Sequence, residues 1–90
     1  MNFEWDEAKA AANLRKHKVT FEEASTIFAD ELSLTGRDPD HSLGEHRFIT
    51  FGLSAGNRIL AVSHAERGDA IRIISARPAT RMERKMYEED

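Results

Sequence analysis

Three consecutive segments with the pattern of β-strands constrain the fold of this chain most. Residues 47–53 alternate between two faces, with the larger apolar side chains on one of them. Residues 58–66 and 70–76 follow, separated by an Arg-Gly-Asp sequence at 67–69 that is typical of a hairpin turn. Strands joined by such short turns pair antiparallel. The second half of the chain therefore predicts an antiparallel sheet.

Helical patterns surround these strands. A short strand at residues 2–5 precedes a helix at 7–17, and a second helix at 21–28 precedes a strand at 32–35. A Thr-x-x-Glu capping box begins the second helix and another begins the last, at 80–87. The predicted order is β-α-α-β-β-β-β-α. We expect an α+β fold, in which an antiparallel sheet of four to five strands packs on helices, as one domain over residues 1–90.

Composition excludes several classes of protein. The chain has no cysteine, which excludes disulfides, a thiol nucleophile and thiolate metal ligands. It has no apolar run near the roughly 20 residues that cross a membrane, and its first residues lack the basic and then apolar layout of a signal peptide. We expect a soluble, cytoplasmic protein that makes no contact with a membrane.

The basic residues are unevenly distributed along the chain. Six of the nine arginines lie between Arg58 and Arg84. From Arg58 to Lys85 there are seven basic and three acidic residues, whereas the rest of the chain has six basic and thirteen acidic ones. A guanidinium group can bind two phosphate oxygens at once. This segment therefore predicts a phosphate-binding surface, although the formal net charge of the chain is −3.

His64 and Glu66 are two residues apart in a predicted strand, so their side chains share one face. Two registers of the hairpin are possible. A two-residue turn places His64 opposite Ile73, on a face shared with Arg77, whereas a three-residue turn places it opposite Arg72. Either register brings an imidazole, a carboxylate and a guanidinium to one sheet face.

Such a set can cleave RNA without a metal ion. A base removes the proton of the ribose 2′-hydroxyl, an acid protonates the leaving 5′-oxygen, and arginines stabilise the charge of the transition state. The candidate catalytic residues are His64, Glu66, Arg67 and Arg77. The candidate RNA-binding residues are Lys16, His17, Arg72 and Arg81. The alternative is a polar sheet face with cross-strand ion pairs.

A metal site is a further possibility. Asp38, Asp40 and His41 form the best local group of ligands, but short Asp-Pro-Asp loops are common turns and no pair of histidines has helical ligand spacing. We therefore expect neither a metal ion nor another cofactor.

Short sequences spread over nearly the whole chain resemble those of the BrnT toxins. These are Phe3-Glu4-Trp5-Asp6, Lys9, Asn13, Lys16-His17, Val19, Phe21-Glu22, Glu45-x-Arg47, Glu66-Arg67-Gly68, Arg72 to Arg77, Thr80, Glu83 and Arg84. Each is weak by itself, and the combination is specific. One departure is Lys18, where the family often has glycine. If this position needs a positive φ, lysine costs about 1 kcal/mol there.

The resemblance implies a ribonuclease toxin of a bacterial type II toxin–antitoxin pair, with a RelE-like fold and no metal. It also implies a BrnA-like, ribbon-helix-helix antitoxin that neutralises the toxin and binds the operon's own DNA. We expect a 2:2 heterotetramer, RNA as the substrate, and contact with operator DNA only through the antitoxin. The alternative is an inactive homologue that serves as one half of a repressor complex.

Overall fold

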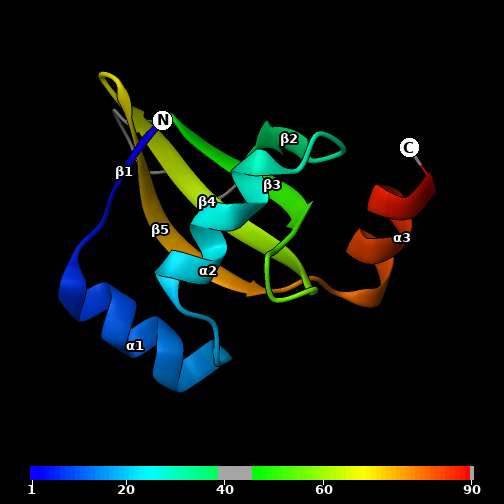
Figure 1. The fold of residues 1–90 in the computed structure, drawn as a ribbon, viewed down its shortest axis with the longest axis horizontal. Coiled ribbons are helices and arrows are strands. Elements are labelled where there is room, and N and C mark those ends of the chain that lie inside the picture. Colours follow the sequence, from blue (N-terminus) through cyan, green and yellow to red (C-terminus); the bar gives the residue numbers. More distant parts are fainter. Residues whose placement is uncertain (39–45, 90) are drawn as a thin grey trace.

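The structure is a computed structural model that describes residues 1–38 and 46–89, and it confirms the α+β class and the predicted order of elements (Figure 1). The elements are β1 (Asn2–Glu4), α1 (Glu7–His17), α2 (Phe21–Ser25), the 3₁₀ helix η1 (Thr26–Ala29), β2 (Leu34–Arg37), β3 (Arg47–Leu53), β4 (Ile59–Arg67), β5 (Ala70–Pro78) and α3 (Arg81–Glu89). Within the described residues, no helix is long and apolar enough to cross a membrane.

The five strands form one sheet in the order β1-β5-β4-β3-β2. The pairs β2–β3, β3–β4 and β4–β5 are antiparallel, as the short connections between them predict. β1 pairs with β5 in parallel, with Phe3 opposite Ile71. The expectation of a wholly antiparallel sheet is therefore wrong at this edge. The chain from β1 passes through two α-helices, the 3₁₀ helix and three strands before it reaches β5, so no short turn fixes the direction of this pair.

The core lies between the sheet and the first two helices. We call the sheet face under α1 and α2 the inner face and the opposite one the outer face (Figure 1). Fully buried side chains of the helical half are Val19, Phe21, Ala24 and Ile27, and those of the strands are Leu60, Val62, Ile73 and Ala76. Each large apolar side chain buried here contributes about 1.5–3 kcal/mol. Because the two faces belong to the same strands, the packing of the inner face also positions the side chains of the outer face.

Asn13 fastens α1 to the sheet. Its amide nitrogen donates to the carbonyl oxygens of Val19 and Ala76 at 3.0 and 2.8 Å, and its amide oxygen accepts from the Ala76 nitrogen at 3.0 Å. Asn13 is buried, and these bonds use all of its polar atoms in contacts with backbone groups. They hold the helix in one position along β5.

The hairpin between β4 and β5 has the two-residue turn, Gly68-Asp69, with Arg67 opposite Ala70 and His64 opposite Ile73. Gly68 has φ +60°, a conformation that glycine adopts without strain. The register is therefore the first of the two that the sequence left open.

A β-bulge interrupts this pairing one step further from the turn. Ser63 pairs with Ser75 while His64 pairs with Ile73, so Ile74 is an extra residue on β5. Because side chains alternate between faces, the extra residue moves Ser75 and Arg77 to the face opposite His64. The bulge therefore decides which side chains can meet.

α3 is attached at both ends by polar contacts. The second capping box is complete, because Thr80 nitrogen donates to Glu83 at 2.9 Å and Glu83 nitrogen donates to Thr80 at 3.2 Å. Near the other end, the Tyr87 hydroxyl donates to Asp30 at 2.5 Å. Of the described residues of α3, none is buried. The helix therefore lies at the side of the sheet and presents most of its surface to solvent (Figure 1).

Candidate functional site

The outer face carries a row of charged side chains across four strands. Arg47 on β3 pairs with Ala65 on β4, Ala65 pairs with Arg72 on β5, and Arg72 pairs with Glu4 on β1. Residues paired in this way point to the same face. Arg47 and Arg72 therefore lie on either side of a small side chain, with Glu4 at the edge.

Two more arginines share this face. Arg77 lies opposite Ala61, four residues from Ala65 along β4, and Arg67 follows Ala65 by two residues at the end of the strand. Ser63, between the two alanines, pairs with a second serine on β5. We call Arg47, Arg67, Arg72 and Arg77 the arginine face. Small side chains on β4 leave the guanidinium groups as the most prominent polar groups of this surface.

Internal carboxylates contact two of these guanidinium groups. Arg72 is 3.0 Å from Glu4, and Arg77 binds Glu83 with two bonds of 2.7 and 3.0 Å. The Arg77 guanidinium lowers the pKa of Glu83 to about 2, and Glu83 raises the pKa of Arg77. Both carboxylates come from outside the three central strands, one from β1 and one from α3. An anion that binds both terminal nitrogens of Arg77 must displace Glu83, whereas Glu4 contacts a single nitrogen of Arg72 and leaves the others for an anion.

His64 lies on the inner face, within the core. Its side chain is 5% exposed, its Nε2 is 2.7 Å from the Thr50 hydroxyl, and its ring contacts Phe28 and Phe48. Burial lowers its pKa to about 4, so the imidazole is neutral near pH 7. Its Nδ1 has no hydrogen-bond partner within the described part of the chain. This environment is that of a packed core residue.

The four candidate catalytic residues do not meet on one face. Glu66 shares the inner side of β4 with His64 and is exposed at the hairpin end, whereas Arg67 and Arg77 lie on the outer face. The expectation that an imidazole, a carboxylate and a guanidinium share one face is therefore wrong. The bulge at Ile74 is the reason, because it reverses the side of the sheet that Arg77 occupies.

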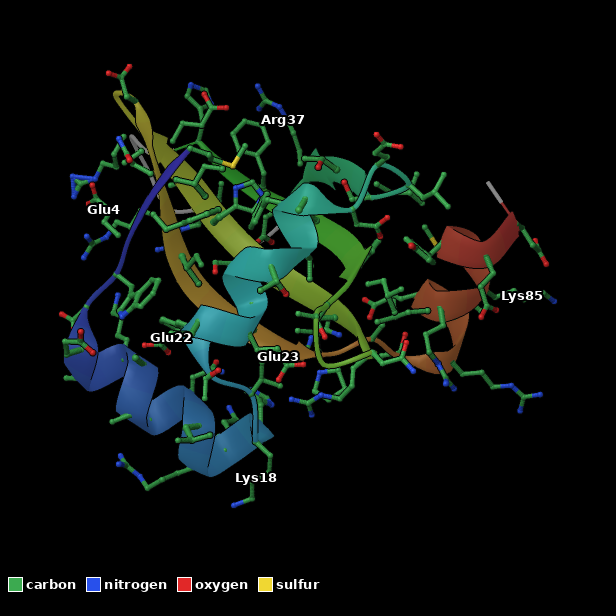
Figure 2. The ribbon with its side chains drawn as sticks, viewed as in Figure 1. Glu4, Lys18, Glu22, Glu23, Arg37 and Lys85 are labelled. Carbon is green, nitrogen blue, oxygen red and sulfur yellow. The ribbon has the colours of Figure 1, made fainter. Side chains whose placement is uncertain are left out.

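The four candidate RNA-binding residues are also separated. Arg72 belongs to the arginine face, and Arg81 is exposed at the first position of α3. Lys16 and His17 end α1, which packs on the inner side. Figure 2 labels the neighbouring Lys18 at that end of α1 and Lys85 on α3, in distant parts of the molecule. No single surface holds all four.

A metal centre finds no support in the residues that the structure covers. Neither 1–38 nor 46–89 contributes a group of three or more histidine or acidic side chains that could hold an ion. Asp40 and His41, which the metal hypothesis needs beside Asp38, lie outside the described residues.

Three residues of this surface were not assigned a role from the sequence. Arg47 belongs to this surface because the register of β3, β4 and β5 aligns it with Arg72. Glu4 and Glu83 belong to it because they bind arginines. All three residues belong to the sequences that resemble the BrnT toxins, which was the one available signal. Their positions depend on strand register, which the sequence left open.

Comparison with known proteins agrees with this architecture. A family model described as the ribonuclease toxin BrnT of type II toxin–antitoxin systems matches residues 5–83. The crystal structure of the Brucella abortus ribonuclease toxin BrnT superposes with a TM-score of 0.65 at 26% sequence identity, over 90% of this chain and 99% of that one. A comparison with curated protein sequences gives no match.

Proposed function

Because the chain belongs to the BrnT family of ribonuclease toxins of type II toxin–antitoxin systems, we propose that it is a metal-independent endoribonuclease. In this proposal a cognate, BrnA-like antitoxin holds the enzyme inactive. The complex of the two proteins represses its own operon and contacts operator DNA only through the antitoxin.

The main structural support for this proposal is the arginine face. It gathers four guanidinium groups from three adjacent strands on a part of the sheet that α1 and α2 do not cover. Cleavage of a phosphodiester needs little covalent chemistry from the protein and much stabilisation of negative charge. Fixed guanidinium groups provide that stabilisation, which a divalent cation supplies in metal-dependent nucleases.

The proposed reaction is an attack by the ribose 2′-oxygen. The 2′-hydroxyl loses its proton, its oxygen bonds to phosphorus, and the bond from phosphorus to the 5′-oxygen breaks as that oxygen gains a proton. The products are a 2′,3′-cyclic phosphate and a 5′-hydroxyl. Arg72 and Arg77 would hold the non-bridging oxygens, Arg72 through the nitrogens that Glu4 does not contact and Arg77 after it leaves Glu83. Arg67 has no ion-pair partner among the described residues and is available at once.

Glu66 and His64 have different roles in this proposal. Glu66 is the candidate for proton transfer, but it is exposed at the hairpin end of β4 on the side opposite Arg67, so it would have to reach the phosphate around that end of the sheet. His64 is a positioning residue, because its contacts are Thr50 on β3 and two aromatic rings of the core. We place Lys16 and His17 outside the main RNA contact, since α1 covers the inner side.

The type II family implies an antitoxin that acts on the toxin. An acidic antitoxin segment can satisfy the same guanidinium groups that would otherwise meet phosphate, and opposite charges speed the association. We propose that the antitoxin covers the arginine face in a 2:2 complex and competes with RNA. Simultaneous binding of antitoxin and a non-cleavable RNA with undiminished affinity would contradict this.

The test of the reaction is a pair of RNAs that differ at one nucleotide. Purified protein is incubated with an RNA that contains a mapped cleavage site, and with the same RNA carrying a 2′-deoxy sugar on the 5′ side of that site. The proposal predicts a 2′,3′-cyclic phosphate product from the first and no cleavage at the site in the second. Cleavage of the deoxy site, or a 5′-phosphate product, would exclude attack by the 2′-oxygen.

A second candidate function is an inactive homologue that binds its partner and no longer cleaves. The ion pairs of Arg72 and Arg77 favour it, because both guanidinium groups are neutralised in this structure. Growth arrest on expression without the antitoxin separates the two, since only an active enzyme stops growth.

A further inference from the structure

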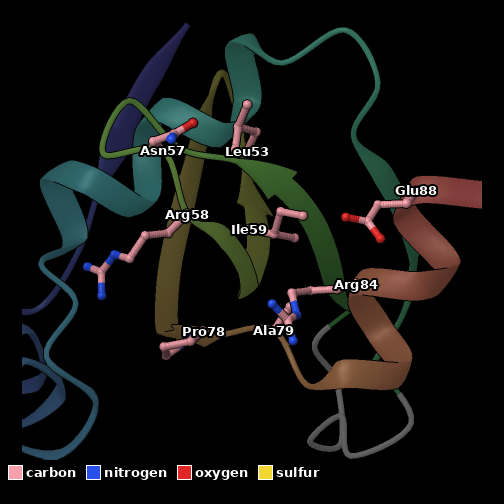
Figure 3. A pocket seen from close by; sticks show the side chains of 8 residues that line it. All are labelled: Leu53, Asn57, Arg58, Ile59, Pro78, Ala79, Arg84 and Glu88. Atoms are coloured by element: carbon pink, nitrogen blue, oxygen red, sulfur yellow. The ribbon is translucent and has the colours of Figure 1, made fainter.

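A pocket of about 370 Å³ opens between α3 and the end of the sheet (Figure 3). Its apolar side is formed by Leu53 and Ile59, which pair across β3 and β4, and by Pro78 at the end of β5. Its polar groups are Asn57 and Arg58, in the connection between β3 and β4, and Arg84 and Glu88 from α3. This volume falls within the range of small-molecule sites.

Of the three charged groups of the pocket, Arg58 is bound by Glu23. The other two, Arg84 and Glu88, are one helical turn apart on α3 and point the same way. In Figure 3, Arg84 and Glu88 project from α3 toward the end of the sheet. Neither side chain has a hydrogen bond or ion pair with any described residue, in contrast to Arg58 and Arg77, which are held by carboxylates. A guanidinium that only donates and a carboxylate that only accepts are therefore both available to a ligand.

The pocket continues the arginine face. Leu53 and Ile59 form one cross-strand pair of the outer side, and Phe51 and Ala61, with Arg77 opposite Ala61, form the next. Successive pairs on one side of an antiparallel sheet are about 7 Å apart. A nucleotide whose phosphate meets Arg77 can thus place a neighbouring base in the pocket.

We propose that this pocket is a base-binding subsite for the RNA substrate and that it selects guanine. Among the bases, guanine combines two acceptors on one edge, N7 and O6, with the N1–H and N2–H donors beside them. Arg84 would donate to the acceptors and Glu88 would accept from the donors. Leu53, Ile59 and Pro78 would pack against the flat ring, and the Asn57 amide would supply a further contact.

The subsite rests on the proposed ribonuclease function, and its test separates the two. A pool of short RNAs with one randomised position is cleaved, and the product ends are sequenced. We expect guanine to be enriched at one fixed position beside the cleaved bond. Glu88→Gln and Arg84→Ala should each reduce the preference for guanine over adenine by on the order of tenfold. Matched controls on the same helix are Glu89→Gln and Lys85→Ala, which should keep the preference of the original protein.

A binding experiment tests the subsite without cleavage. The methyl groups of Leu53 and Ile59 are followed by NMR during titration with guanosine and adenosine monophosphates, and the proposal predicts larger shifts with the guanine nucleotide. Cleavage without any base preference, or a preference unchanged in both pocket variants, would overturn the proposal. If no RNA is cleaved, the ribonuclease function falls and the titration alone decides the subsite. Methyl shifts caused by the antitoxin and by neither nucleotide would instead make the pocket a protein contact.

Discussion

Lys18 has a backbone conformation that costs free energy. It ends α1 with φ 60° and ψ 34°, the left-handed region that glycine enters without a clash. The sequence marked this position through its departure from the family pattern, and the structure shows the positive φ. We predict that Lys18→Gly raises the free energy of unfolding by about 1 kcal/mol. Urea unfolding measures the change. Lys18→Ala is the control, because alanine keeps the Cβ atom and should bring no such gain.

The structural role of Asn13 could not be predicted from its residue type. It was one of the residues that resemble the BrnT toxins, yet nothing in the sequence predicted that its amide joins α1 to β5. We predict that Asn13→Ala lowers the free energy of unfolding by about 3 kcal/mol, because backbone groups of Val19 and Ala76 lose their partner inside the core. The exposed Asn2→Ala is the control. A loss below about 1 kcal/mol would mean that water replaces the amide without cost.

The buried His64 makes stability depend on pH in a defined window. Its pKa in the folded protein is about 4 against an ordinary value of 6.5. Above pH 6.5 the ring is neutral in both states and has no effect. Between pH 6.5 and 4 the imidazole is protonated in the unfolded chain and stays neutral in the folded protein, so the free energy of unfolding falls as pH falls. We predict that His64→Gln removes most of this slope, as measured by urea unfolding at several pH values. An unchanged slope in the variant would show that His64 is not its source.

At the scale of elements, the order of helices and strands was predictable from the sequence, but the faces of the sheet were not. Periodicity of two residues located β3, β4 and β5, and one capping box located the start of α3. The bulge at Ile74 has no local signature, and it reversed the side that Arg77 occupies. The capping box at Thr20 is only half formed, because Glu23 binds Arg58 and Ser54 instead of the helix end. In both cases, contacts between residues far apart in the sequence determined the structure, and local sequence patterns did not.

α3 depends on its two polar attachments. None of its described residues is buried, so little apolar packing holds it. We predict that Tyr87→Phe, which removes the hydrogen bond to Asp30, increases amide hydrogen exchange in α3 by roughly tenfold or more and leaves β4 and β5 unchanged. Met86→Ala on the same helix is the control, since that side chain is half exposed. Faster exchange in all strands would show instead that α3 belongs to the cooperative core.

At the scale of the whole molecule, six of the nine arginines lie between Arg58 and Arg84, and three of these six, Arg67, Arg72 and Arg77, belong to the arginine face. These three arginines meet Arg47 only after β3, β4 and β5 have paired, so the grouping depends on the register of these strands. The separation of Lys16 and His17 from Arg72 is a consequence of the same layering. The sequence shows which residues are charged, and the packing of helices on one face of the sheet determines which of these side chains share a surface.

In the proposed function, the arginine face cleaves RNA without a metal ion. The measurement is the rate at which purified protein cleaves an RNA in excess EDTA. Three proteins are compared: the original, a double variant with Arg72→Ala and Arg77→Ala, and a control double variant with Arg15→Ala and Lys9→Ala. The control pair removes the same charge from exposed positions of α1 on the inner side. We predict cleavage in EDTA, a loss of roughly a hundredfold or more in the arginine-face variant, and no change in the control. Cleavage that needs an added divalent ion, or equal rates in all three proteins, would contradict it.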